Sequence, residues 1–193
     1  MSARGQDDDA DTTTYVLVDG ENIDATLGTS ILGRRPHPEE RPRWDRLLSF
    51  ARAQWGQEVK GLFFLNAGGG LPMAFVQALK AMGYEPIPLA GPADAKVVDI
   101  AIQRTLQALA GRAADLMLVS HDGDFLADME HLLDDDRRVG VVAFTEFRNA
   151  GFTALEGRGL QTFDLEYAVG AFNTRLPRIR VIPIEEFDPV AYL

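Results

Sequence analysis

The feature that most constrains the fold is a regular alternation of short apolar runs and amphipathic helical stretches along the chain. Strands separated by helices of about 10 to 15 residues are typical of βαβ units, whose parallel sheets are covered by helices on both faces. The sequence therefore predicts an α/β fold in which helices flank a central, mostly parallel sheet. Strands are predicted at about residues 15–18, 59–65, 84–89, 115–119, 139–144 and 160–163.

The helical stretches fill most of the segments between these strands. In the first of them, Trp44 is the first residue of an apolar face and is expected to pack into the core. Pro86 and Pro88 lack a backbone N–H, which indicates that strand 84–89 lies at an edge of the sheet. Residues 33–42 are rich in Arg and Pro and are predicted to form a surface loop. Helices are predicted over 43–55, 72–82, 94 or 95–110, 125–133 and 147–156.

Acidic residues directly follow two of the apolar runs. Residues 15–18 lead into Asp-Gly-Glu-Asn at 19–22, and residues 116–119 lead into Ser-His-Asp-Gly-Asp at 120–124. The carboxyl ends of parallel strands meet at one edge of an open α/β sheet, where such folds build their sites. Helix capping is the competing interpretation for these acids, and it is compatible with metal binding by other members of the set. The acids expected to meet at this edge are Asp19, Asp122 and Asp124.

A further acid, Asp99, interrupts an apolar series at the start of the predicted helix ending at 110. Lys96, Asp99 and Gln103 fall on one helical stripe by their spacing of three and four residues. An ordinary surface ion pair between Lys96 and Asp99, worth less than about 1 kcal/mol, is the alternative. Acids gathered at one sheet edge repel one another unless a cation lies among them. Because the chain has no cysteine, oxygen-only ligation favours Mg²⁺ or Mn²⁺ and a metal-dependent hydrolase.

Three motifs in this order resemble a known family: Asp19-Gly20-Glu21-Asn22, Lys96-x-x-Asp99 and Ser120-x-Asp122-x-Asp124-Phe125. They are similar to the NYN domain, a branch of the PIN-like nucleases that includes LabA-like bacterial proteins. The resemblance implies a PIN-like three-layer α/β/α sandwich, with a metal-dependent endoribonuclease site that uses Mg²⁺ or Mn²⁺ to hydrolyse RNA. It implies metal-binding and catalytic roles for Asp19, Asp99, Asp122 and Asp124, and supporting roles for Asn22, Lys96 and Ser120.

The sequence also allows predictions for other residues in and near these motifs. His121 is predicted to be a solvent-facing turn residue rather than a general base. Glu21 is given no role, because adjacent residues on an extended segment face opposite ways. Arg34 and Arg35 are candidates for contacts to single-stranded RNA, and a solvated loop is the alternative.

The net charge of −10 disfavours a protein that binds RNA by bulk electrostatics. The alternative function is therefore a PIN-like RNA-binding or regulatory module with little catalysis, which acts through a protein partner. A haloacid-dehalogenase-like phosphatase and a Toprim domain fit less well, because Asp19 is followed by Gly20-Glu21-Asn22 and a Toprim domain starts from a glutamate. The motifs are compatible with RNA or DNA as the substrate and with endo- or exonucleolytic cleavage. They specify neither the RNA target nor the number of metal ions.

The 193 residues are expected to form one domain with two appendages. The predicted boundaries are a disordered leader at 1–13, an NYN/PIN-like domain at 14–165 and a C-terminal extension at 166–193 that packs on the domain or on a partner. Residues 178–182 of the extension suggest an extra strand, and its apolar residues are compatible with a homodimer. The chain contains no apolar run of the roughly 20 residues that span a bilayer and no signal-peptide pattern, so a cytoplasmic location is expected.

Overall fold

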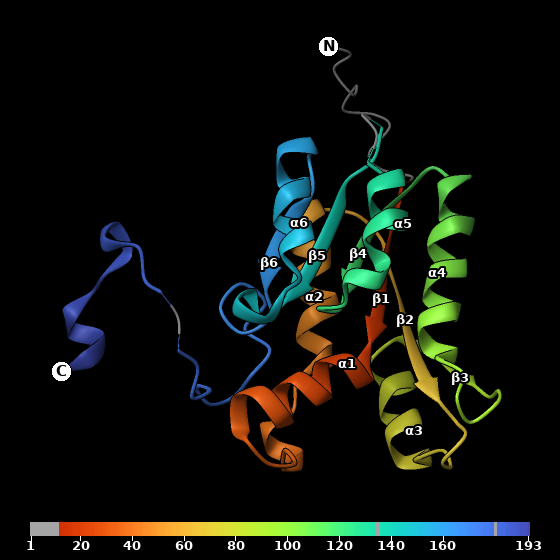
Figure 1. Cartoon of the computed structure of the whole chain (residues 1–193), viewed down its shortest axis with the longest axis horizontal. Coiled ribbons are helices and arrows are strands. Elements are labelled where there is room, and N and C mark those ends of the chain that lie inside the picture. The colour runs from red at the N-terminus through yellow and green to blue at the C-terminus, as the bar shows by residue number, and fades with distance from the viewer. Residues whose placement is uncertain (1–11, 134–135, 180) are drawn as a thin grey trace.

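The computed structural model describes residues 12–133, 136–179 and 181–193, and its centre is a six-stranded sheet (Figure 1). Every neighbouring pair of strands is parallel, in the order β3-β2-β1-β4-β5-β6. The predicted α/β fold is confirmed, and β3 with its two prolines is indeed an edge strand. The strands are β1 (Thr13–Asp19), β2 (Val59–Asn66), β3 (Tyr84–Leu89), β4 (Ala114–Val119), β5 (Val139–Ala143) and β6 (Gln161–Asp164).

Helices cover both faces of the sheet and complete a three-layer α/β/α sandwich (Figure 1). On one face lie α2 and α3, and on the other lie α4, α5 and α6. Trp44 is the first residue of α2 and is buried, as predicted. The helices are α1 (Gly20–Ala25), which continues as a π-helix (Thr26–Leu32), α2 (Trp44–Trp55), α3 (Met73–Ala81), α4 (Val97–Ala110), α5 (Leu126–His131) and α6 (Ala150–Leu155).

The strands are apolar on both faces because each face is covered. Successive side chains of a strand point to opposite sides, so Val16 and Val18 pack in the core beneath α2 and α3. Leu17, between them, packs in the second core beneath α4 and α5. Burial on both sides explains why these strands are nearly continuous runs of Val, Leu, Phe and Met in the sequence.

The strand order places the candidate site. From β1 the chain moves outward to β2 and β3, then crosses back to β4 on the other side of β1 and continues to β5 and β6. The carboxyl ends of β1 and β4 are therefore adjacent, and Val18 lies opposite Val119 in the register. A crevice at this reversal of strand order is where open α/β sheets bind ligands.

The predicted extra strand at 178–182 is wrong for the described residues of that segment, which belong to no strand. Pro177 and Pro183 flank it without backbone N–H groups to donate, and Ile179 and Val181 are 94% and 93% exposed. Earlier in the predicted extension, Val169, Ala171 and Leu176 pack in the core. Its last residues lie away from the sheet (Figure 1).

Two other features of the chain bear on the predictions. Residues 20–32, which follow β1, are helical, whereas the sequence suggested a helix there only through the capping interpretation of Asp19. Of the predicted leader at 1–13, residues 1–11 lie outside the described part of the structure. None of the described helices has the length and apolar composition of a membrane-spanning helix.

Candidate metal centre

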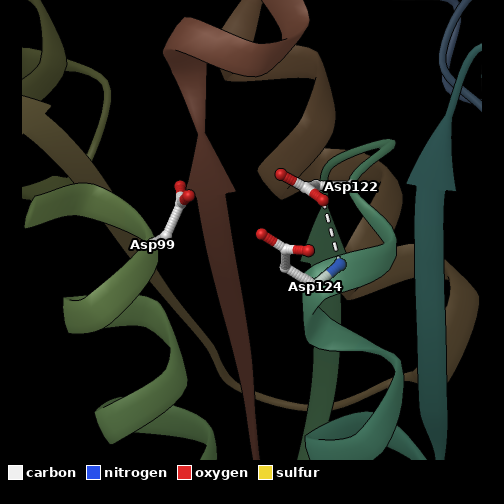
Figure 2. A group of neighbouring side chains, drawn as sticks. All are labelled: Asp99, Asp122 and Asp124. Carbon is white, nitrogen blue, oxygen red and sulfur yellow. Dashed lines mark hydrogen bonds between the residues drawn. The ribbon is translucent and has the colours of Figure 1, made fainter. Parts of the chain in front are cut away.

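Three acids converge beside the carboxyl ends of β1 and β4. Asp99 lies in the first turn of α4, and Asp122 and Asp124 follow β4. One carboxylate oxygen of each lies within 4.8 Å of those of the other two. Figure 2 shows Asp99 on α4 on one side of the group and Asp122 and Asp124, which follow β4, on the other. These three residues are here called the acidic cluster. The sequence predicted that they lie together with Asp19, and three of the four predicted acids form the group.

The turn after β4 fixes two members of the acidic cluster. The Asp124 backbone N–H donates to Asp122 Oδ1 at 2.9 Å, so that Asp122 caps the short 3₁₀ helix Gly123–Phe125. A Cβ atom at Gly123 would meet the Asn149 side chain at 2.4 Å, which explains the glycine between the two acids. Asp122 therefore caps this short helix and also belongs to the acidic cluster.

Asp19 lies next to the acidic cluster but is not one of its three mutually close members. Its side chain is buried, Oδ2 accepts from Ser120 Oγ at 2.9 Å, and Oδ1 accepts from the Asn22 backbone N–H at 3.3 Å. Burial raises the pKa of Asp19 to about 6, and the negative charges of Asp99 and Asp122 act in the same direction. Asp19 thus caps α1 and also adds negative charge behind the cluster.

The ammonium group of Lys96 contacts two members of the acidic cluster. Its Nζ lies 3.1 Å from Asp124 Oδ2 and 3.5 Å from Asp99 Oδ2. The Gln103 side chain donates to the Asp124 backbone carbonyl at 3.2 Å, so the predicted stripe does face the cluster. Burial raises the pKa of Asp99 even though Lys96 acts to lower it. The Lys96 side chain is 68% exposed, so its charge is largely screened by water.

The sequence mispredicted the environment of His121. It is 7% exposed rather than solvent-facing, because the helical segment after β1 covers it and Thr26 Oγ1 lies 3.2 Å from Nδ1. Its Nε2 accepts from the Phe144 backbone N–H at 2.9 Å. Burial lowers the pKa of His121 to about 4, so the ring is neutral at pH 7. A sequence signal did exist, since His121 follows a strand that is buried throughout.

The supporting residues Asn22 and Ser120 belong to the same hydrogen-bonded unit. Asn22 Oδ1 accepts from the His121 backbone N–H at 2.9 Å and lies 2.8 Å from His121 Nδ1. Ser120 Oγ, which donates to Asp19, also accepts from the Asp122 backbone N–H at 3.2 Å. These bonds connect the carboxyl ends of β1 and β4 into one rigid arrangement.

Glu21 and Arg34 form hydrogen bonds to residues outside the acidic cluster. Glu21 Oε1 accepts from the Asn66 backbone N–H at 3.3 Å, which joins the ends of β1 and β2. The Arg34 guanidinium donates to both carboxylate oxygens of Glu40, at 2.7 and 2.6 Å. These bonds from Arg34 lower the pKa of Glu40 to about 2. Arg35 is exposed in the same loop.

The chain matches the NYN domain family over residues 13–156 and belongs to that family. A solved structure with a similar fold is a protein of unknown function from Vibrio parahaemolyticus RIMD 2210633. It has a TM-score of 0.61 and 19% sequence identity, and the match covers 81% of this chain and 94% of that one. At this identity the likeness shows the fold alone. Among curated proteins, none matches the chain.

Proposed function

We propose that this protein is a divalent-metal-dependent ribonuclease that hydrolyses RNA phosphodiester bonds at the acidic cluster. The observation that supports the proposal is the convergence of Asp99, Asp122 and Asp124, whose ligand oxygens lie within 4.8 Å of one another. Family membership and the position of the cluster at the reversal of strand order agree with it.

The donor set fits Mg²⁺ or Mn²⁺. All candidate ligands are carboxylate oxygens, which these hard cations prefer, and the three come from two rigid elements. Burial raises the pKa of both Asp19 and Asp99, which indicates that their charges are incompletely compensated by the protein. A bound divalent ion supplies Lewis-acid chemistry for phosphodiester hydrolysis. In this proposal Asp99, Asp122 and Asp124 hold the ion, and Asp19 binds it directly or through water.

The chain's own residues then arrange the substrate. Lys96 lies at the open side of the cluster, where its ammonium group can neutralise a phosphate oxygen. Ser120 and Asn22 hold the carboxylate of Asp19 through hydrogen bonds to its two oxygens. Because these groups are fixed before RNA arrives, the site needs little rearrangement on binding.

The test is cleavage of labelled single-stranded and structured RNA with Mn²⁺, Mg²⁺ or EDTA. Asp122→Asn should reduce the metal-dependent rate at least about a hundredfold, because a single removed ligand weakens metal binding and charge stabilisation by several kcal/mol. Asp128→Asn is a matched control, since Asp128 lies on α5 and accepts from Gln107 instead of joining the cluster. Equal rates in wild type and Asp122→Asn, with both folded, would contradict the proposal.

RNA contacts by Arg34 and Arg35 form a separate part of the proposal. Arg34 already binds Glu40, so Arg35 is the better candidate for a phosphate contact. Replacing both arginines by Ala should weaken RNA binding more at 50 mM than at 200 mM salt. An unchanged affinity at both salt concentrations would remove this loop from the RNA site.

A catalytically weak module that acts through a protein partner is the second candidate. The observation that favours it is a series of exposed apolar side chains near the C-terminus, including Ile184 at 77% and Val190 at 75% exposure. Metal-dependent turnover distinguishes the two functions. A chain that binds metal and RNA but cleaves neither RNA substrate would support the second candidate.

A further inference from the structure

The His121 ring bridges two strand ends through both of its nitrogens. Nε2 lies 2.9 Å from the backbone nitrogen of Phe144, just after β5. Nδ1 lies 2.8 Å from Asn22 Oδ1, in the first turn of α1. The ring also stacks on Phe144, with centroids 5.6 Å apart and an angle of 12° between the planes.

These contacts determine which ring nitrogen carries the proton. The Phe144 backbone N–H can only donate, so Nε2 must be the unprotonated acceptor. A neutral imidazole has one N–H, which is therefore on Nδ1 and donates to Asn22 Oδ1. Turning the ring over would replace both nitrogens by carbons at these positions, so the contacts also fix the ring orientation.

The same logic fixes the carboxamide of Asn22. The His121 backbone N–H, a second obligate donor, lies 2.9 Å from the Asn22 atom that Nδ1 also approaches. That atom must be the oxygen, since the amide nitrogen cannot accept. Asn22 Oδ1 is thus occupied twice, and its Nδ2 points away from both donors. In the part of the chain that the structure describes, no residue accepts a hydrogen bond from Nδ2.

We infer that His121 is a positioning residue that holds the Asn22 carboxamide so that Nδ2 donates to a phosphate oxygen of RNA bound at the acidic cluster. The inference rests on the proposed nuclease function and adds a role for two residues. Asn22 belongs to the unit that holds Asp19, because its backbone N–H donates to Asp19 Oδ1. A donor fixed before the reaction stabilises charge that develops on the phosphate, so its loss should lower kcat more than it changes KM.

Two matched substitutions separate the contacts of His121. In His121→Asn the amide nitrogen can occupy the place of Nδ1, which keeps the donor to Asn22 and loses the acceptor for Phe144. In His121→Gln the amide oxygen can occupy the place of Nε2, which keeps that acceptor and loses the donor to Asn22. Both variants remove the buried ring, so both should lower the melting temperature. Asn22→Asp keeps Oδ1 for His121 and removes the Nδ2 donor.

The experiment measures kcat and KM for single-stranded RNA with Mn²⁺, together with the ring ¹⁵N resonances of His121 at pH 7. His121→Gln and Asn22→Asp should each lower kcat about tenfold, which is the effect expected from the loss of one hydrogen bond. His121→Asn should lower kcat several-fold less than His121→Gln does, because it keeps the donor to Asn22. The ¹⁵N spectrum should show a neutral ring protonated at Nδ1.

Three results would overturn the inference. A ring protonated at Nε2 would remove the donor to Asn22. Equal losses of kcat in His121→Asn and His121→Gln would mean that His121 only fills space. Failure of the nuclease proposal itself looks different: wild type would cleave no RNA with any metal, and the inference would fall with it although the ring spectrum stayed as expected.

Discussion

Two groups of acidic side chains lie at the same edge of the sheet, and they differ in what compensates their charge. One is the acidic cluster with its neighbour Asp19. The other, here called the arginine-centred group, consists of Glu146, Asp164 and Glu166 around Arg178. Both follow carboxyl ends of parallel strands, so their position in the fold does not distinguish them.

The arginine-centred group is compensated within the protein. The Arg178 side chain is 0% exposed, and its Nη1 lies 2.8 Å from Asp164 Oδ1 and 2.9 Å from Glu166 Oε2. Its Nε donates to Glu146 at 2.7 Å. Burial acts to raise the pKa values of Asp164 and Glu146, but hydrogen bonds from Arg178 outweigh it and hold both pKa values below the ordinary range.

The acidic cluster has only a partial counterpart to Arg178. Lys96 contacts two of its members from the solvent side, and the pKa values of Asp19 and Asp99 are raised rather than lowered. The comparison teaches that acids at a strand end do not by themselves define a metal site. What marks this site is that burial raises the pKa of Asp99 despite the contact with Lys96, and raises the pKa of the neighbouring Asp19 as well.

Removing the cation of the arginine-centred group should have the largest effect on stability. Arg178→Met leaves three partly buried carboxylates without their partner and should lower the free energy of unfolding by about 3–5 kcal/mol. Urea denaturation measures this change. Arg175→Met is the control, because Arg175 is exposed and its guanidinium lies over the Tyr192 ring. Equal stability of the two variants would mean that the arginine-centred group does not hold this segment to the domain.

The two groups should change the stability of the folded protein in opposite directions as pH rises. Since the folded pKa of Asp19 is about 6 and its ordinary value is 3.8, the protonated form favours folding. This contribution, at most about 3 kcal/mol, is complete below pH 4 and is lost as pH rises through about 6. The lowered pKa values of Asp164 and Glu146 contribute stability at neutral pH that is lost as pH falls.

Denaturation of metal-free wild type and Asp19→Asn across pH 4–8 isolates the Asp19 contribution. The difference in unfolding free energy should change in favour of Asp19→Asn as pH rises through about 6. A difference that stays constant over this range would show that Asp19 titrates with an ordinary pKa in the folded protein.

Divalent metal should stabilise the acidic cluster and leave the arginine-centred group unaffected. Mn²⁺ at 100 times its dissociation constant should add about 2.7 kcal/mol to the free energy of unfolding of wild type. Asp122→Asn should lose most of this gain at the same concentration, whereas Asp128→Asn should keep it. Equal stabilisation of all three proteins would place the bound ion elsewhere.

The smallest effect is expected at Lys96. Because its side chain is mostly exposed, Lys96→Met should change the free energy of unfolding by less than about 1 kcal/mol. The variant should bind Mn²⁺ more tightly, since a competing positive charge is gone. Calorimetric titration measures the affinity, and weaker binding by Lys96→Met would contradict the view that Lys96 only partly compensates the cluster.

The local pattern of apolar and polar residues was sufficient to predict much of the fold and the members of the acidic cluster. Short apolar runs between helical patterns predicted all six strands, because a sheet covered on both faces needs continuous apolar strands. Asp122 and Asp124 were recognisable because they follow such a strand directly. Asp99 stood out because a carboxylate interrupts the apolar series on its helix.

The environment of individual side chains was harder to predict from the sequence. His121 was expected in solvent, and its burial depends on Thr26 and Phe144, which come from distant parts of the chain. Arg178 was placed in a possible strand, whereas its guanidinium is buried among acids from the ends of β5 and β6. Neither contact leaves a periodic trace in the sequence, because each joins elements that meet only in the folded sheet.

The sequence by itself determined the α/β architecture, the acids that end β1 and β4, and the oxygen-only chemistry that they offer a cation. Only the tertiary structure decided which acids are left without a sufficient partner. The strand order brings Asp99, Asp122 and Asp124 together, and it places Asp164 where it forms an ion pair with Arg178. The physical reason is that a carboxylate's charge is set by burial and by neighbours within a few ångströms, and those neighbours are chosen by the fold.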